Sequence, residues 1–493
     1  MKDNSYSNIF KTTFLFGFVQ IFNVVVKVGT NKVVALLLGA EGMGIISLLN
    51  TTVNLLKTGA GLGVSQSAVR DISEACQSQD YSRLSSTISI THKIILFTSL
   101  LGILITLLLS PYLSHCNFGN YGYTATFMLL SLMVGMNVLT EGQLSILTGM
   151  RRLRQLALAS MIGAVVGLLS AIPFYYIWGK DGIVPSLLVT AFSALFFSSY
   201  FVRKVKYEKI QFSFNEFKMR ATPIVKMGVA LMLVTFLGFM FDLIVSAYIR
   251  STGGLDEVGY YQAGVTIIGG YFGVIITAMS TDYYPRISAV HSDNSKLSTE
   301  LNKQAETGLI LIFPLVILFV FITPFLVRFL YSDKFLVSSN YTDYAIFGTI
   351  IIIVSNCMGM ILLAKQAAKI FILSVLLQRT LLIVVYIYAY RNWGLSGLGY
   401  SYVMTGVIHI GIMILILKHR YNITLNSNVY RMLILVICMT IITFLIRQID
   451  MVWLKYSAGI VSFLFCSLYS YKYVKDKMNI DICQAFIDKI KKK

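Results

Sequence analysis

The sequence predicts an all-α, polytopic membrane protein of about fourteen transmembrane helices, arranged as two six-helix lobes in a parallel repeat plus two extra helices. Apolar residues occupy 56% of its 493 positions and charged residues only 13%, whereas about a quarter of a soluble domain is charged. A chain this long and this apolar cannot bury its surface in one core, so lipid must be its main solvent. The apolar residues also fall into windows of about twenty, and the chain resembles itself at one constant offset.

The helices are expected in windows of roughly twenty apolar residues or more. The windows are 9–39, 43–68, 88–113, 122–149, 156–178, 181–202, 222–250, 257–285, 304–330, 342–364, 370–390, 395–417, 430–447 and 452–472. The first window is too long for the apolar part of a cleavable signal peptide.

Lysine and arginine set the orientation of these helices. About thirty of the 41 basic residues fall on the side of both termini, and about seven on the other side. This excess predicts that both termini are cytoplasmic, because positive charge is retained inside. The net charge of +19 is therefore explained by topology, with no nucleic-acid partner. The basic tail can also rest on anionic lipid headgroups.

An internal repeat appears when the chain is shifted by about 215 positions. The turn 39–44 then lies over 254–259, and three single matches follow in order: Arg154 over Lys369, Gly182 over Gly397 and Ser186 over Ser401. Six helices are an even number, so the two halves share one orientation about an axis along the membrane normal. We expect lobes over 1–220 and 221–425, additional helices over 426–475 and a basic tail over 476–493, with a cleft between the lobes that permits alternating access.

Polar residues make one stripe on the first helix. They recur at spacings of three and four: Gln20, Asn23, Lys27 and Asn31. The repeat carries Lys27 onto Asp242. Because a charge at mid-bilayer costs about 2.5–3.5 kcal/mol, such residues usually face a cavity or a partner. Lys27 and Asp242 are expected to face each other or a shared water-filled cavity; the alternative is a structural ion pair that joins the lobes.

Four further charges fall inside predicted helices. Lys32 lies about 140° around the helix from Lys27 and either faces another wall or snorkels outward. Lys57 is close enough to the cytoplasm to snorkel, and Arg379 is deep in its helix. Glu141 has no partner on its own helix. An isolated buried carboxylate can carry a proton near neutral pH, so Glu141 is a candidate for ion coupling, with a structural hydrogen bond as the alternative.

The window 257–285 is rich in small residues. Gly264, Gly269, Gly270 and Gly273 suit close helix packing, and a glycine-rich helix can also bend.

Sequence signals for an enzyme are missing, so no catalytic residue is expected. The glycine-rich run 59–63 lies in a membrane helix and follows no strand, which excludes a dinucleotide-binding loop. There is no HExxH, Walker A or nucleophile-elbow motif, and the six cysteines are scattered with no metal-ligand spacing. No metal and no cofactor are expected.

Five short runs, in their order, carry a family resemblance. They are KVVALLLGAEGMG at 32–44, GLGVSQSAVR at 61–70, YPRIS at 284–288, RFLYSDKF at 328–335 and GLSGLG at 394–399. Together they resemble the polysaccharide transporters of the multidrug/oligosaccharidyl-lipid/polysaccharide superfamily, and most of all the Wzx-type O-antigen flippases. The chain departs from the family at Ala40, where proline is frequent.

The resemblance implies a function in lipopolysaccharide or capsule biosynthesis. A flippase of this kind moves an oligosaccharide on undecaprenyl pyrophosphate from the inner to the outer leaflet of the bacterial inner membrane. Family members carry basic residues in a central cavity, and the matching candidates here are Lys27, Lys32, Lys57 and Arg379. A polysaccharide polymerase and a chain-length regulator are implied partners, and relatives can be coupled to a proton or sodium gradient.

Two other functions agree less well with the sequence. A multidrug extruder of the same superfamily should line its cavity with carboxylates for cationic drugs, whereas bases outnumber deep acids here. A membrane polysaccharide polymerase is expected to need sizeable charged outer loops, but the longest outer connections, 114–121 and 331–344, are short.

Overall fold

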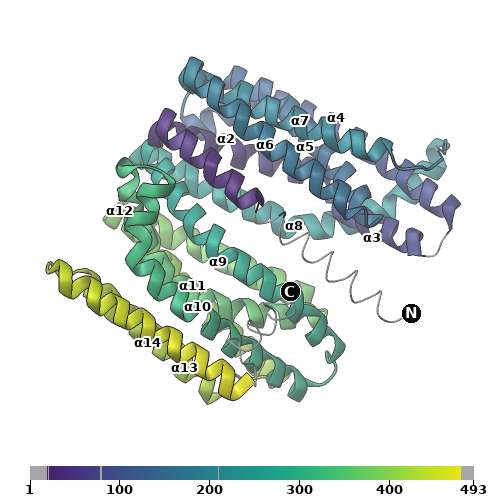
Figure 1. The fold of residues 1–493 in the computed structure, drawn as a ribbon. Helices are drawn as coiled ribbons and strands as arrows, with labels where there is room; N and C mark the ends of the chain where they lie inside the picture. The colour runs from purple at the N-terminus through teal and green to yellow at the C-terminus, as the bar shows by residue number, and fades with distance from the viewer. Residues whose placement is uncertain (1–18, 20–21, 78–79, 209, 479–493) are drawn as a thin grey trace, which may run out of the picture. The chain divides into compact units, whose positions relative to one another are not determined.

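The structure is a computed structural model that describes residues 19, 22–77, 80–208 and 210–478 (Figure 1). Throughout these residues the regular structure is helical, without a strand. Packing divides the chain into two compact units. The first unit contains the described residues up to Gly259 together with Leu330–Ser332, and the second contains Tyr260–Phe329 and the described residues from Asp333 onward.

The first unit begins with a helix over 22–37. The elements that follow are α2 (Gly39–Gly61), α3 (Val64–Gln77), α4 (Tyr81–Phe118), α5 (Thr124–Gly149), α6 (Leu153–Trp178), the short 3-10 turn η1 (Gly179–Gly182), α7 (Ile183–Arg203) and α8 (Phe214–Gly253). A buried cluster that includes Ile72, Ile88, Ile146 and Val202 holds α3, α4, α5 and α7 together. This packing fixes α5, the helix that carries Glu141.

The second unit is formed around α10 and α11, whose side chains are largely buried. Its elements are α9 (Leu255–Ala289), which begins within the first unit, α10 (Asn294–Leu330), the 3-10 turn η2 (Asp333–Ser338), α11 (Ser339–Ala364), α12 (Ala368–Tyr421), α13 (Ser427–Arg447) and α14 (Val452–Met478). Figure 1 shows α13 and α14 as a pair of neighbouring helices at the end of the chain.

Ten candidate membrane spans are found among the described residues. Two of them, Leu153–Arg203 and Lys369–Tyr421, contain 51 and 53 residues. At 1.5 Å per residue each would be about 75–80 Å long, more than twice the hydrocarbon thickness, so each must cross twice. The all-α polytopic fold is therefore confirmed.

The two double spans turn in the same way at positions that the repeat equates. A Cβ on Gly182 would lie 2.2 Å from the carbonyl oxygen of Phe174, and a Cβ on Gly397 would lie 2.1 Å from that of Ala389. Each glycine thus approaches the backbone eight positions earlier, at a distance that no side chain tolerates. This shared geometry supports the match of Gly182 with Gly397.

The predicted helix over 43–68 is wrong in one respect, because it is two helices. The break lies at Leu62 and Gly63, which have φ angles of 50° and 61°. A Cβ on Gly63 would lie 2.1 Å from the carbonyl oxygen of Gly228 on α8. The turn between α2 and α3 is therefore a place where the two backbones pack directly against each other.

The boundary between the two packing units does not coincide with the predicted boundary between the lobes. The units separate after Gly259, and α8 belongs to the first unit. The lobes 1–220 and 221–425 were inferred from the repeat, not from packing, and they remain a prediction.

Candidate functional site

Lys57 and Glu141 form an ion pair in the first unit. The Nζ atom of Lys57 on α2 donates to Oε1 of Glu141 on α5 at 2.6 Å. The side chains are 20% and 46% exposed, respectively. Glu141 lies in a candidate membrane span. Glu141, which has no partner on its own helix, is therefore paired with a lysine from another helix, and its role in ion coupling stays a prediction.

The first helix carries the predicted polar stripe. Lys27 is exposed, whereas Asn23 and Asn31 are half-buried. The Oδ1 atom of Asn23 is buried without a hydrogen-bond partner in the part of the chain that the structure describes. A buried amide oxygen left in this state costs about 1–3 kcal/mol, which water or a ligand donor would recover. Gln20, the fourth member of the stripe, lies outside the described residues.

Lys32 makes a contact of a different kind. Its Nζ donates to the backbone carbonyl oxygen of Tyr331 at 2.5 Å. Residues 330–332 belong to the same unit as the first helix. Of the two alternatives for Lys32, the contact favours a protein wall over snorkelling into the headgroups.

The remaining two candidates belong to different packing units. Asp242 is exposed on α8 in the first unit, and Arg379 is half-buried on α12 in the second. The pairing of Lys27 with Asp242 and the substrate-binding roles of all four basic residues stay predictions. Among the predicted site residues, the structure brings Lys57 and Glu141 together.

Sequence analysis missed a second ion pair, in the other unit. Arg447 at the end of α13 binds Asp343 of α11 through two hydrogen bonds of 2.6 and 2.5 Å. It also donates to the carbonyl oxygen of Val320 on α10 at 3.0 Å. The sequence signal for this pair is the presence of opposite charges at two helix ends on the same predicted side.

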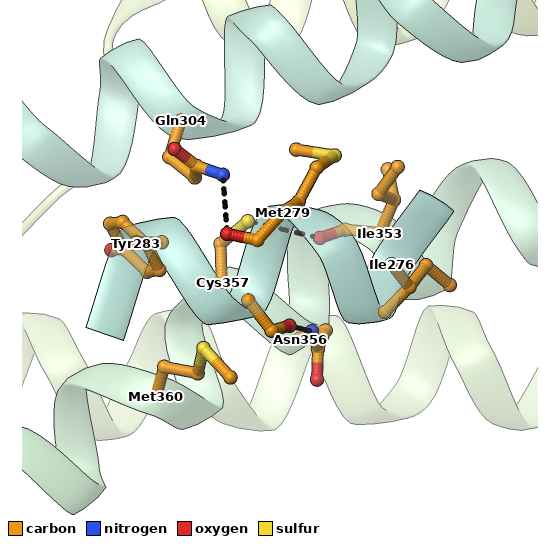
Figure 2. Close-up of a pocket in the computed structure, with 9 residues that line it drawn as sticks. Ile276, Met279, Tyr283, Gln304, Ile353, Asn356, Cys357 and Met360 are labelled. Carbon is orange, nitrogen blue, oxygen red and sulfur yellow. Dashed lines mark hydrogen bonds between the residues drawn. The ribbon is translucent and has the colours of Figure 1, made fainter. Parts of the chain in front are cut away.

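A small cavity lies among α9, α10 and α11 in the second unit (Figure 2). Its volume of about 10 Å³ is room for about one water molecule. Asn356 donates to the hydroxyl oxygen of Ser280 at 3.0 Å, and Gln304 donates to the carbonyl oxygen of Met279 at 3.4 Å. The buried hydroxyl of Tyr283 has no partner among the described residues. The cavity suits a structural water and is far too small for a sugar.

Comparison with solved structures places this fold among membrane transporters. The chain is similar to the lipid II flippase MurJ in an inward closed conformation, with a TM-score of 0.68, 13% identity, and 94% of this chain and 99% of that chain covered. It is also similar to an inward-facing multidrug resistance MATE family transporter of the MOP superfamily, with a TM-score of 0.67, 14% identity, and 83% and 96% covered. A third similar structure is a MOP superfamily transporter from Pyrococcus furiosus, described by a reverse polarity of its binding pocket. Its TM-score is 0.59 and its identity 15%, with 84% of this chain and 96% of that chain covered. At these identities the likeness shows the fold.

Sequence comparison gives the family. No curated protein matches the chain. A family model described as "Polysaccharide biosynthesis protein" matches residues 33–340, which is more than half of the chain. The matched region begins in the helix that carries Lys32 and includes the Lys57–Glu141 pair. The chain therefore belongs to this polysaccharide biosynthesis protein family.

Proposed function

We propose that this protein is a flippase that moves an undecaprenyl-pyrophosphate-linked oligosaccharide, an O-antigen or capsule repeat unit, from the inner to the outer leaflet. Membership of a polysaccharide biosynthesis family supports a glycan substrate. The fold, which is similar to that of a lipid II flippase over 94% of the chain, supports transport across a bilayer rather than catalysis. The protein would reside in the bacterial inner membrane with both termini cytoplasmic, beside a polymerase and a chain-length regulator.

The observation that carries the proposal is the set of basic side chains on helices that the sequence predicts to cross the membrane. Lys27 is exposed, Lys57 is mostly buried but held by Glu141, and Arg379 is half-buried. A pyrophosphate loses its hydration when it leaves the membrane surface, and charge-assisted hydrogen bonds from such groups would replace part of it. The lipid tail would stay in the bilayer while the sugar passes through the cleft between the lobes.

The Lys57–Glu141 pair also offers a way to couple transport to a proton gradient. While Glu141 is ionised, its carboxylate holds the ammonium group of Lys57 at 2.6 Å. A proton on Glu141 would remove the charge that binds Lys57 and release the ammonium group to an anionic substrate. Each proton taken up would thus favour the substrate-bound state.

The test is complementation of a strain that lacks this protein. Lys27→Gln and Lys57→Gln should each lower the amount of surface glycan and leave lipid-linked oligosaccharide on the inner leaflet. The matched control is Lys180→Gln, because Lys180 is a half-exposed lysine that pairs with Glu41 outside the candidate site. Normal export by both site variants, at wild-type protein levels, would refute the proposal.

The second candidate is a multidrug extruder, which the similarity to a MATE family transporter favours. That structure covers 83% of the chain, against 94% for the flippase. Drug susceptibility of the same deletion strain separates the two functions. Hypersensitivity to cationic drugs with normal surface glycan would select the extruder.

A further inference from the structure

A groove follows one face of α8 ahead of its membrane span. It has a volume of about 380 Å³. Its lining residues recur at spacings of three and four along the helix: Phe214, Phe217, Lys218, Ala221, Thr222, Val225 and Lys226. Residues with this spacing form a single stripe on a helix. The groove is therefore a continuous surface more than three turns long.

The helix that carries the groove is firmly held. Ser213 caps α8, and the side chain of Glu216 accepts hydrogen bonds from the backbone N–H and the hydroxyl of Ser213. Ala221 and Ile224 are buried against Ile90 and Ile94 of α4. The groove thus has a rigid floor, which lowers the entropic cost of binding a ligand.

The surface of the groove combines apolar groups with unpaired positive charge. Phe214 is 77% exposed, although it is a large apolar side chain. Lys218 and Lys226 are exposed and have no ion-pair partner among the described residues. They lie eight residues apart, about 12 Å along the helix, so two flexible ammonium groups can converge on one anion. The only carboxylate nearby on α8, that of Glu216, is engaged by Ser213.

The position of the groove along α8 gives the depth at which it lies. Lys226 is the last charged residue of α8 before Asp242, and residues 227–241 carry no charge. The helix therefore enters the apolar part of the bilayer after Lys226, which places Lys226 at the headgroup region. The positive-inside rule assigns this end of α8 to the cytoplasmic leaflet.

We propose that the groove binds an anionic phospholipid of the cytoplasmic leaflet. The two lysines contact its phosphate, and one acyl chain lies along Phe217, Ala221 and Val225. A free phosphate would leave this apolar lining exposed to water. A lipid covers the lining with its acyl chain while its phosphate pairs with the two lysines. The site is distinct from the flippase residues, so it holds whether or not the proposed substrate is correct.

The test measures lipid binding by native mass spectrometry of the purified, delipidated full-length protein, with phosphatidylglycerol or phosphatidylcholine added. The double variant Lys218→Gln/Lys226→Gln should lower the affinity for phosphatidylglycerol about 25-fold, since each lysine near an anionic surface contributes roughly fivefold. Its affinity for phosphatidylcholine should stay within about twofold of wild type.

The matched control is Lys296→Gln/Lys303→Gln, which removes two exposed lysines on the same predicted side. These pair with Asp293 at 3.6 Å and Glu300 at 3.2 Å, respectively. This control and the charge-preserving Lys218→Arg/Lys226→Arg variant should bind phosphatidylglycerol like wild type. The proposal is overturned by an equal loss in the control, by an unchanged affinity in the groove variant, by displacement of the lipid with millimolar inorganic phosphate, or by loss of a co-purifying protein without loss of lipid.

Discussion

Gly44 of α2 and Gly259 of α9 make reciprocal contacts. A Cβ on Gly44 would lie 2.1 Å from the carbonyl oxygen of Leu255, and a Cβ on Gly259 would lie 2.0 Å from that of Ala40. A shift of about 215 positions carries Ala40 onto Leu255 and Gly44 onto Gly259. Two equivalent surfaces that contact each other in this way are the mark of a twofold axis. The reciprocal contact between these two turns is what the predicted pseudo-twofold repeat leads us to expect, and the axis itself stays a prediction.

This contact predicts that a single methyl group at either glycine destabilises the protein. In Gly44→Ala or Gly259→Ala the new Cβ meets a backbone carbonyl, which cannot rotate away as a side chain can. We expect each variant to lose about 1–3 kcal/mol, the usual cost of overpacking. Thermal unfolding of the purified protein in detergent measures the loss.

Gly61→Ala is the control for this pair. Gly61 also lies in α2, but a Cβ there meets nothing within 4 Å. Its replacement should leave the melting temperature unchanged or raise it slightly. Equal melting temperatures for all three variants would contradict the packing argument.

The Lys57–Glu141 pair predicts that its two single substitutions have non-additive effects on stability. Lys57→Gln and Glu141→Gln each leave one charge without its partner, and Lys57 is the more buried of the two. We expect a coupling energy of about 1 kcal/mol, limited by the partial exposure of Glu141. A double-mutant cycle on thermal stability measures it.

The swapped variant Lys57→Glu/Glu141→Lys separates packing from transport. It restores the ion pair and should recover stability, but it moves the base from α2 to α5. If Lys57 contacts the substrate, export should remain low in the swapped variant. Recovery of both stability and export would show that the pair is purely structural.

The buried pair of Asp343 and Arg447 predicts a larger effect. The two side chains are 12% and 18% exposed, so removal of the carboxylate leaves a guanidinium group buried without its counter-charge. Asp343→Asn should therefore cost about 3–5 kcal/mol, and the release of α13 from α11 should appear as increased proteolysis near residue 450.

A nearby surface pair provides the comparison for Asp343. Arg328 and Asp333 are 2.9 Å apart but 60% and 82% exposed. Asp333→Asn should change stability by less than about 1 kcal/mol, because water screens the pair. If both substitutions lower the free energy of unfolding equally, burial does not determine the strength of the Asp343–Arg447 pair.

The sequence predicted what depends on local pattern. Apolar windows are local, so the helices were found, and Gly182 and Gly397 could be matched because each marks the same tight turn. The contacts of the candidate site depend on how distant helices pack. Lys57 and Glu141 are 84 positions apart, and nothing on either helix specifies the neighbour that it meets. The break at Leu62 was missed for the same reason, since it accommodates the approach of Gly228.

The small residues of α9 differ in how closely they pack against other helices. Of the four glycines Gly264, Gly269, Gly270 and Gly273, close packing explains Gly264, where a Cβ would lie 2.6 Å from the ring of Tyr341. At Gly269, Gly270 and Gly273 a Cβ meets nothing within 4 Å. Each of these three glycines therefore costs α9 about 1 kcal/mol relative to alanine without any gain in packing. The lower helix stability at these glycines makes α9 easier to bend, which a transport cycle that bends this helix requires.

We accordingly expect Gly270→Ala to raise the melting temperature and to slow export several-fold, since it stiffens α9 without a clash. Gly264→Ala should do the opposite to stability, because its methyl group forces Tyr341 to move. Surface glycan measured over time after induction, at matched protein levels, gives the export rate. A Gly270→Ala variant that exports at the wild-type rate would show that α9 does not bend during transport.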